Sequence, residues 1–157
     1  MNAQQKSTIL PLLKDAETNR NYETDYWFSY KDFLDPTDNF TDFQCECLDG
    51  KLGYIALIEN LINMDETAKV FVQVYGVDGD DDEPFIYADT LIIFSKLSLA
   101  EINQIFNEPK DIFPSEIGEY EYTDFSQSAF LIGDNGELIP GAKLLNDDQF
   151  VYYCWWD

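Results

Sequence analysis

The chain has 157 residues, a length typical of one domain, and 45% of them are apolar, which is enough to form a hydrophobic core. Its 9 Lys and Arg face 31 Asp and Glu, which sets the formal net charge at −22. Such a charge repels nucleic-acid phosphates and anionic membrane surfaces and attracts basic proteins. We therefore expect no nucleic-acid or membrane partner, although acidity that serves only solubility or a high-salt habitat would look the same.

The expected compartment is the cytoplasm. No window reaches the ~18 apolar residues of a membrane span. The N-terminal segment lacks the cleavage-site pattern of a signal peptide. The three cysteines are an odd number, and Cys45 and Cys47 are too close together for an ordinary disulfide framework.

Helices are predicted for the first part of the chain. Apolar residues at helical spacing predict a helix at residues 7–18, with Pro11 in its first turn, where a missing N–H costs little. A second helix is expected at residues 25–34, whose aromatic and apolar side chains share one helical face. Residues 43–48 follow as a short strand, and the ambiguous residues 51–64 favour a helix.

Two strands with an acidic connection are predicted next. Residues 68–76 and 85–94 are rich in β-branched and aromatic side chains, and together they predict a hairpin with a charged tip. Asp89 falls inside the second strand, so we expect it to be hydrogen-bonded, at a bulge or on an exposed edge. Residues 98–101 form a capping box, which predicts a helix to about residue 106.

The last part of the chain predicts further strands. Residues 112–121 lack a regular pattern. Residues 129–132 and 138–139 flank Asn135-Gly136, a strong hairpin signal, and residues 149–156 form a last, buried strand. The expected fold is therefore α+β, with N-terminal helices packed on a mainly antiparallel sheet in a single domain at residues 1–157.

Several catalytic chemistries are excluded by composition. The chain has no histidine, which rules out Ser-His-Asp and Cys-His catalysis and histidine-ligated zinc. Carboxylate pairs are abundant, but no glycine-rich phosphate loop or nucleophile elbow accompanies them. We expect no enzymatic activity and no cofactor.

The cysteines are predicted to be structural. Cys45 and Cys47 would point to the same face of a strand, as half of a thiolate metal site would require. Only Cys154 remains as a further soft ligand, so we expect small apolar core residues without a metal.

An acidic segment matches part of the pattern of a calcium-binding loop. Asp78, Asp80 and Asp82 match the first three ligands of an EF-hand loop, yet Glu83 replaces the required glycine and Asp89 occupies the twelfth position within a strand. A solvated loop and a partner-facing loop both remain open as alternatives.

Acidic residues cluster around aromatic ones in a way that suits a protein interface, where aromatics anchor and charges steer. Aromatics facing the core and acids facing water would give the same pattern. The candidate partner-binding residues are Asp78, Asp80, Asp81, Asp82, Glu83, Asp32, Asp35, Asp38, Asp42, Tyr120 and Tyr122.

The whole chain resembles the immunity proteins of bacterial polymorphic-toxin and contact-dependent growth inhibition systems. The likeness lies in YADTLIIFSKLSLAEINQIF (residues 87–106), AFLIGDNGELIP (residues 129–140) and the ending QFVYYCWWD (residues 149–157). The resemblance implies a small, acidic, non-enzymatic cytoplasmic protein that neutralises a toxin domain, often a basic nuclease.

We therefore expect a one-to-one complex with a basic toxin domain whose active site is occluded, with carboxylates replacing substrate phosphates. The alternative is a DNA mimic that inhibits a DNA-binding protein.

Overall fold

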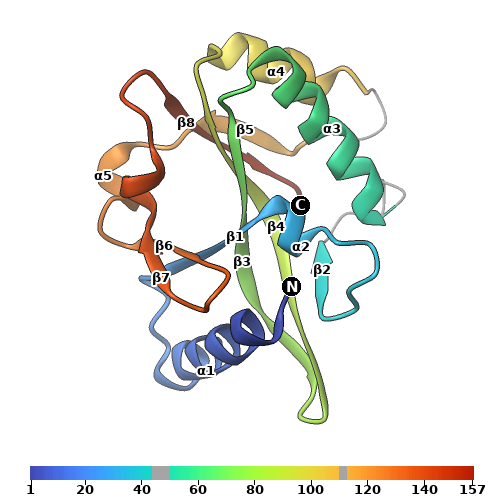
Figure 1. Ribbon diagram of the computed structural model, residues 1–157, viewed down its shortest axis with the longest axis vertical. Helices are drawn as coiled ribbons and strands as arrows, with labels where there is room; N and C mark the ends of the chain where they lie inside the picture. Colours follow the sequence, from blue (N-terminus) through green and yellow to red (C-terminus); the bar gives the residue numbers. More distant parts are fainter. Residues whose placement is uncertain (44–49, 110–112) are drawn as a thin grey trace.

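The computed structural model describes residues 1–43, 50–109 and 113–157. Helices and strands alternate along the chain (Figure 1). In chain order the elements are α1 (Ala3–Asn19), β1 (Asp25–Ser29), α2 (Tyr30–Phe33), β2 (Thr41–Phe43), α3 (Gly50–Met64), β3 (Lys69–Asp80), β4 (Glu83–Ser95), α4 (Leu99–Asn107), β5 (Glu116–Glu119), α5 (Tyr122–Phe125), β6 (Ala129–Ile132), β7 (Leu138–Pro140), the short 3₁₀ helix η1 (Gly141–Leu144) and β8 (Phe150–Trp155).

The strands form one 8-stranded sheet in the order β5-β8-β4-β3-β1-β6-β7, with β2 paired to β4 outside this path. β1 with β6 and β2 with β4 pair in parallel, and the other pairings between the described strands are antiparallel. The predicted α+β class with a mainly antiparallel sheet is confirmed. The helices, however, are not confined to the N-terminus, since α3, α4 and α5 lie among the strands.

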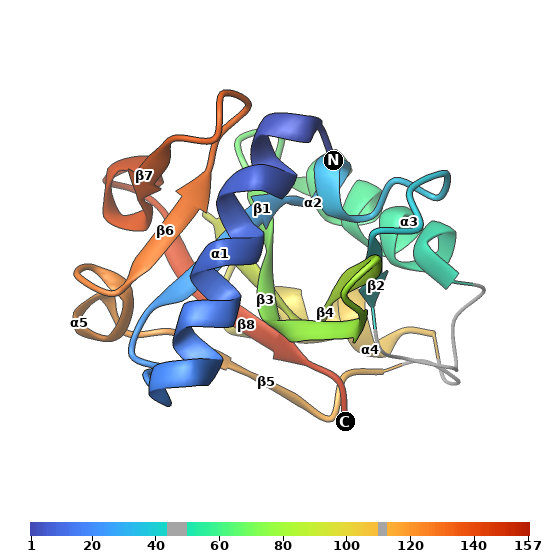
Figure 2. The same cartoon turned by 90° about the horizontal axis from the view of Figure 1, so that it is seen from below.

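Each face of the curved sheet has its own core, and the arrangement is easiest to follow in Figure 2. The helix-side core packs side chains of α1, α2, α3 and α4 against the sheet. Tyr54, Leu57, Ile58 and Leu61 of α3 are buried there at the spacing of one helical face. Cys154 of β8 is fully buried in this core, and burial raises the pKa of its thiol.

The tryptophan core lies on the opposite face and is centred on the fully buried Trp27. The Trp27 ring stacks on Phe71 with centroids 5.8 Å apart and meets Phe94 edge-on at 5.9 Å. Phe125 of α5 completes this cluster at 5.9 Å from Trp27. Aromatic contacts of this kind stabilise a core beyond the area that they bury.

The helix predicted at residues 25–34 is wrong for its first half. Residues 25–29 form the strand β1, and only the single helical turn α2 follows. The reason is that Trp27 and Phe28 point to opposite faces of the sheet, and each is buried in a different core. Alternation with both faces covered is typical of a central strand, and β1 indeed lies between β3 and β6.

α1 confirms the first predicted helix but begins earlier. Asn2 forms a capping box with Gln5, so the helix starts at Ala3 and Pro11 lies in its interior instead of its first turn. The helix is tied to the β6–β7 hairpin, because the Thr8 hydroxyl donates a hydrogen bond to the Gly136 carbonyl at 3.1 Å. None of the helices in the described residues combines the length and the apolar character needed to cross a bilayer.

The remaining sequence predictions are largely confirmed. The β3–β4 and β6–β7 hairpins, α3, α4 with its Ser98–Glu101 capping box, and β8 all form. Of the segment predicted to be irregular at residues 112–121, residue 112 lies outside the described residues, and Glu116–Glu119 pairs with β8 as β5. Of the strand predicted at residues 43–48, Phe43 ends β2, and residues 44–49 with Cys45 and Cys47 lie outside the described residues.

Asp89 meets the expectation drawn for it. Gln73 pairs with Thr90 and Val74 with Ala88, so Asp89 is the extra residue of a β-bulge in β4. Its carboxylate accepts hydrogen bonds from the Thr90 hydroxyl at 2.7 Å and from the Trp155 indole N–H at 3.1 Å. On the other strand, the register shift that follows leaves Tyr75 unpaired.

Candidate functional site

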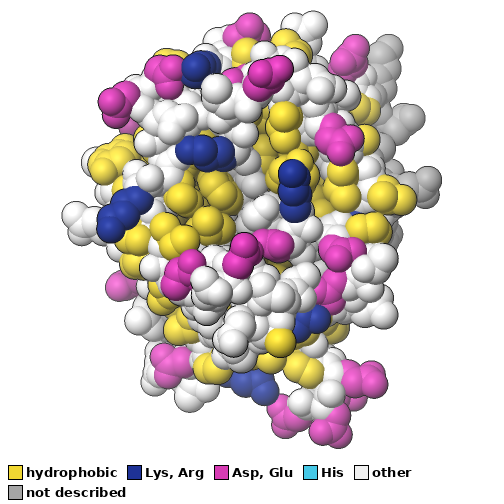
Figure 3. All heavy atoms as spheres, in the orientation of Figure 1, with side chains coloured by type: hydrophobic (Ala, Val, Ile, Leu, Met, Phe, Trp, Pro, Cys, Tyr) yellow, Lys and Arg dark blue, Asp and Glu magenta, His cyan; other side chains and the backbone are white. Residues whose placement is uncertain are grey.

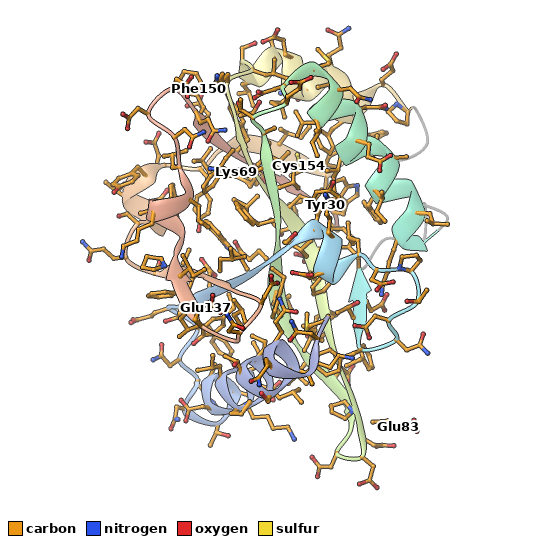
Figure 4. The ribbon with its side chains drawn as sticks, viewed as in Figure 1. Tyr30, Lys69, Glu83, Glu137, Phe150 and Cys154 are labelled. Carbon is orange, nitrogen blue, oxygen red and sulfur yellow. The ribbon has the colours of Figure 1, made fainter. Side chains whose placement is uncertain are left out.

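The acidic tip of the β3–β4 hairpin projects from the body of the protein. Asp80 pairs with Glu83, so only Asp81 and Asp82 form the turn, and all four side chains are exposed. Gly79 has a φ of +91°, and a Cβ there would lie 2.6 Å from the Glu83 carbonyl oxygen. Figure 3 shows carboxylates gathered on this end of the molecule, and Figure 4 places Glu83 beyond the packed side chains.

The second predicted acidic group, at residues 32–42, is mostly engaged within the protein. Asp38 contacts the N-terminal amine at 2.9 Å and Lys6 at 3.1 Å. Burial alone would raise the pKa of Asp38, but hydrogen bonds from the amine, the Phe40 N–H and Lys6 outweigh it and lower the pKa to about 2. Asp32 accepts a hydrogen bond from Gln5.

The other two carboxylates of this group, those of Asp35 and Asp42, have different surroundings. Asp35 accepts hydrogen bonds from the N–H and the hydroxyl of Thr37, which lower the pKa of its carboxyl. Asp42 is exposed on β2, where it pairs with Tyr87 of β4. Asp42 therefore flanks the base of the acidic hairpin.

A pocket of about 560 Å³ opens on the other side of the hairpin base. It lies where α1, the start of β1, β3, β4 and the end of β8 meet, and Figure 2 shows how these elements are arranged. No lysine or arginine is among the described residues that line it. The side chains that give it its chemistry are Glu17, Tyr22, Asp25, Gln73, Tyr75, Tyr87, Asp89 and Trp155.

The carboxylates of Asp25 and Asp89 are held in fixed orientations at this pocket. Asp25 accepts hydrogen bonds from Gln73 at 3.3 Å and from the Tyr120 hydroxyl at 3.1 Å. Burial raises the pKa of Asp25, and the hydrogen bond from Tyr120 opposes this effect. Asp89 is held by its bonds from Thr90 and Trp155. Each ionised carboxylate can accept about four hydrogen bonds, so both keep acceptor capacity for a ligand.

Aromatic rings accompany these carboxylates. Tyr75, which is 69% exposed, packs against Tyr87 with ring centroids 5.4 Å apart. The Tyr87 ring passes close to Gly76, where a Cβ would lie only 3.0 Å from its hydroxyl oxygen. Tyr22 adds another ring that is 67% exposed. Exposed aromatic faces beside carboxylates attract cations through both the ring quadrupole and the charge.

The electrostatic field of the pocket is negative. The pKa of Tyr87 is raised first by burial and then by nearby groups that include Asp78, Glu17 and Asp89. Lys14 of α1 contacts Asp81 at the tip, 3.2 Å away, and does not line the pocket. The site can therefore bind a cationic group, and its residues offer no evident catalytic constellation.

Tyr120 and Tyr122 lie apart from the hairpin, near α5 on the opposite side of Figure 1. Tyr120 is partly buried, with its hydroxyl on Asp25 and its ring packed against Trp27 and Phe125. Burial and the charge of Asp25 raise the pKa of Tyr120. Tyr122 is 55% exposed and packs edge-on against Phe125. The structure thus gathers residues 78–83 at the hairpin tip, places Asp42 beside Tyr87 of β4, and puts the two tyrosines elsewhere.

Sequence reasoning missed most residues of the pocket. Asp25, Tyr75 and Trp155 come from distant segments, and nothing in the sequence indicates that they meet. Asp89 was the one available signal, because a carboxylate within an apolar strand needs partners.

Among the described residues, no group of three or more Cys, Asp or Glu side chains is arranged to hold a metal ion. Comparisons of the chain with protein-family models, with curated proteins and with solved structures found no significant match.

Proposed function

We propose that this chain is a cytoplasmic immunity-type protein that binds a basic toxin domain and occludes its active site. The observation that carries the proposal is the acidic hairpin tip together with the acidic pocket at the base of the same hairpin. The tip places exposed carboxylates on a projecting hairpin, and the pocket adds carboxylates and aromatic rings without a described lysine or arginine among its lining residues.

The shape supports inhibition by insertion. A projecting acidic hairpin can enter a cleft that binds phosphates, where its carboxylates occupy the places of the substrate's charges. The exposed rings at the hairpin base would then be covered by the partner, and aromatic side chains that become fully buried are among those that contribute most to binding. The resemblance of the sequence to immunity proteins supports the same conclusion.

The test is charge reversal at the tip, with Asp80, Asp81 and Asp82 all changed to Lys. The binding partner to test is any basic toxin domain that a neighbouring gene encodes, and the readouts are protection of co-expressing cells and the association rate at several salt concentrations. We expect at least about a tenfold slower association at low salt, because opposite fields can raise association to about 10⁸ M⁻¹s⁻¹ or more.

The matched control reverses the exposed Glu119, Glu121 and Asp124, which changes the net charge equally at the Tyr120–Tyr122 surface. This control should change association much less. Equal effects of the two triple variants would mean that only net charge matters, and no effect of either would contradict inhibition by insertion of the acidic hairpin. Similar binding to several unrelated DNA-binding proteins would instead favour a DNA mimic.

A further inference from the structure

We propose that the pocket at the base of the β3–β4 hairpin receives the guanidinium group of an arginine side chain from the protein partner. This assignment rests on the proposed function and narrows it, because it names the chemical group that the pocket recognises. The pocket is distinct from the hairpin tip and contacts a partner through a different chemistry.

The charges of the pocket select a cation. Asp25, Asp89 and Glu17 line it, and no described lysine or arginine there neutralises them. A cationic side chain entering from a partner would compensate the negative charge of these carboxylates, whereas an anionic or neutral one would not. A basic toxin domain supplies such side chains on its surface.

The geometry favours guanidinium over ammonium. Guanidinium is planar, is weakly hydrated and presents five N–H donors in a fork that matches carboxylate oxygens. Asp25 and Asp89 are both pre-oriented by two hydrogen bonds each, so little ordering is left for binding. The rings of Tyr75 and Tyr87 offer flat faces on which a guanidinium can stack.

The size of the pocket also fits a side chain presented by a folded partner. Its volume of about 560 Å³ is within the ordinary range of ligand pockets, and it is open to solvent at the exposed rings of Tyr22 and Tyr75. An arginine stem can therefore enter over these rings, with the guanidinium reaching the carboxylates deeper in the pocket.

Trp155 makes the proposal measurable. Its indole N–H donates to Asp89 at 3.1 Å, so a guanidinium that binds Asp89 must change the surroundings of this N–H. The probe is N-acetyl-L-argininamide, compared with the lysine analogue and with the uncharged citrulline analogue, and the readout is the indole N–H resonance in a ¹H–¹⁵N spectrum. We expect a saturable shift with a roughly millimolar dissociation constant for the arginine probe.

The expected order of affinity is arginine, then lysine, with no saturable shift for citrulline. Asp25→Asn and Asp89→Asn should each weaken the arginine probe about tenfold, because a charge-assisted bond becomes a neutral one. Asp147→Asn, at an exposed carboxylate that does not line the pocket, should leave the affinity unchanged. Preserved dispersion of the spectrum shows that each variant is folded.

Equal shifts with arginine and citrulline, or no saturable shift with either, would overturn the assignment. Equal loss of affinity in Asp147→Asn and Asp89→Asn would do the same, because it would indicate a general charge effect. These measurements use no protein partner. Failure of the toxin-binding proposal and failure of the arginine pocket are therefore separate outcomes.

Discussion

Asp65 offers a sharp test of how the end of α3 is fixed to the sheet. Asp65 is 7% exposed, and its carboxylate accepts four hydrogen bonds. One oxygen accepts from the N–H and the hydroxyl of Thr67 at 3.0 and 2.6 Å. The other accepts from the Ser95 hydroxyl at 2.7 Å and from the Lys96 N–H at 2.9 Å. The carboxylate therefore joins the end of α3 to the end of β4.

Replacing Asp65 with Asn tests this role. The Asn amide would turn its NH₂ group toward one pair of donors, and a backbone N–H such as that of Lys96 cannot rotate away. We expect the free energy of unfolding at neutral pH to fall by about 2–3 kcal/mol, the cost of one lost charge-assisted bond and one unsatisfied donor. The exposed neighbour Glu66, changed to Gln, removes the same charge and should cost less than about 0.5 kcal/mol.

The pH dependence supplies a second measure. Burial would raise the pKa of Asp65, but its hydrogen bonds lower it from 3.8 to about 2. A lowered pKa in the folded state stabilises the protein above the unfolded value of 3.8, and this stabilisation is lost as the pH falls through about 2. The difference is worth roughly 2 kcal/mol, and screening by solvent at this loop leaves about 1–2 kcal/mol.

The assay is denaturant unfolding of the three proteins between pH 5 and pH 2. The difference in free energy of unfolding between the wild type and Asp65→Asn should shrink by about 1–2 kcal/mol as the pH falls over this range. The corresponding difference between the wild type and Glu66→Gln should stay nearly constant. Self-repulsion among the other carboxylates changes in all three proteins and cancels in the comparison. A gap that is independent of pH, or equal losses in the two variants, would refute the assigned role of Asp65.

Three other outcomes are expected. Raising the salt concentration from about 20 to 150 mM should raise the melting temperature, because salt screens the self-repulsion that comes with a net charge of −22. A melting temperature that stays flat or falls would contradict this. Trp27→Ala should cost about 3–5 kcal/mol by denaturant unfolding, and Phe150→Ala, at a side chain 58% exposed, less than about 0.5. Gly136→Ala should cost more than about 1 kcal/mol in the same assay, because φ is +77° there and a Cβ would lie 2.5 Å from the Thr8 hydroxyl; an unchanged stability would mean that the hairpin rearranges freely.

Local patterns predicted those parts of the fold whose signals lie within one segment. The capping box at Ser98, the Asn135-Gly136 turn and the β-branched strands β3 and β4 all act through neighbours in the chain, and all three predictions are confirmed. The segment at residues 25–34 failed because its aromatic spacing suits a helical face, while burial of Trp27 and Phe28 on opposite faces is decided by β3 and β6. That choice depends on tertiary contacts.

The candidate site was less accessible to sequence reasoning. The acidic tip could be found because its carboxylates are consecutive, and its strands extend further into the acidic segment than predicted. The pocket could not be found, because Asp25 is far in sequence from Trp155 and its partner Tyr120. Asp38, placed in the partner-binding group by its neighbours, forms ion pairs with the N-terminal amine and Lys6, a contact that no local pattern indicates.

The parallel pairing of β1 with β6 has a consequence for the order in which the sheet assembles on the ribosome. The pairing of β1 with β6 places Asp25 opposite Ala129, so one edge of β1 has no partner until about 100 more residues have been synthesised. At roughly 5–20 residues per second, that delay lasts several seconds or more. The β3–β4 hairpin becomes available much sooner and can cover the other edge of β1. The nascent chain therefore carries an open strand edge next to Trp27, where a chaperone or a second chain could bind before translation ends.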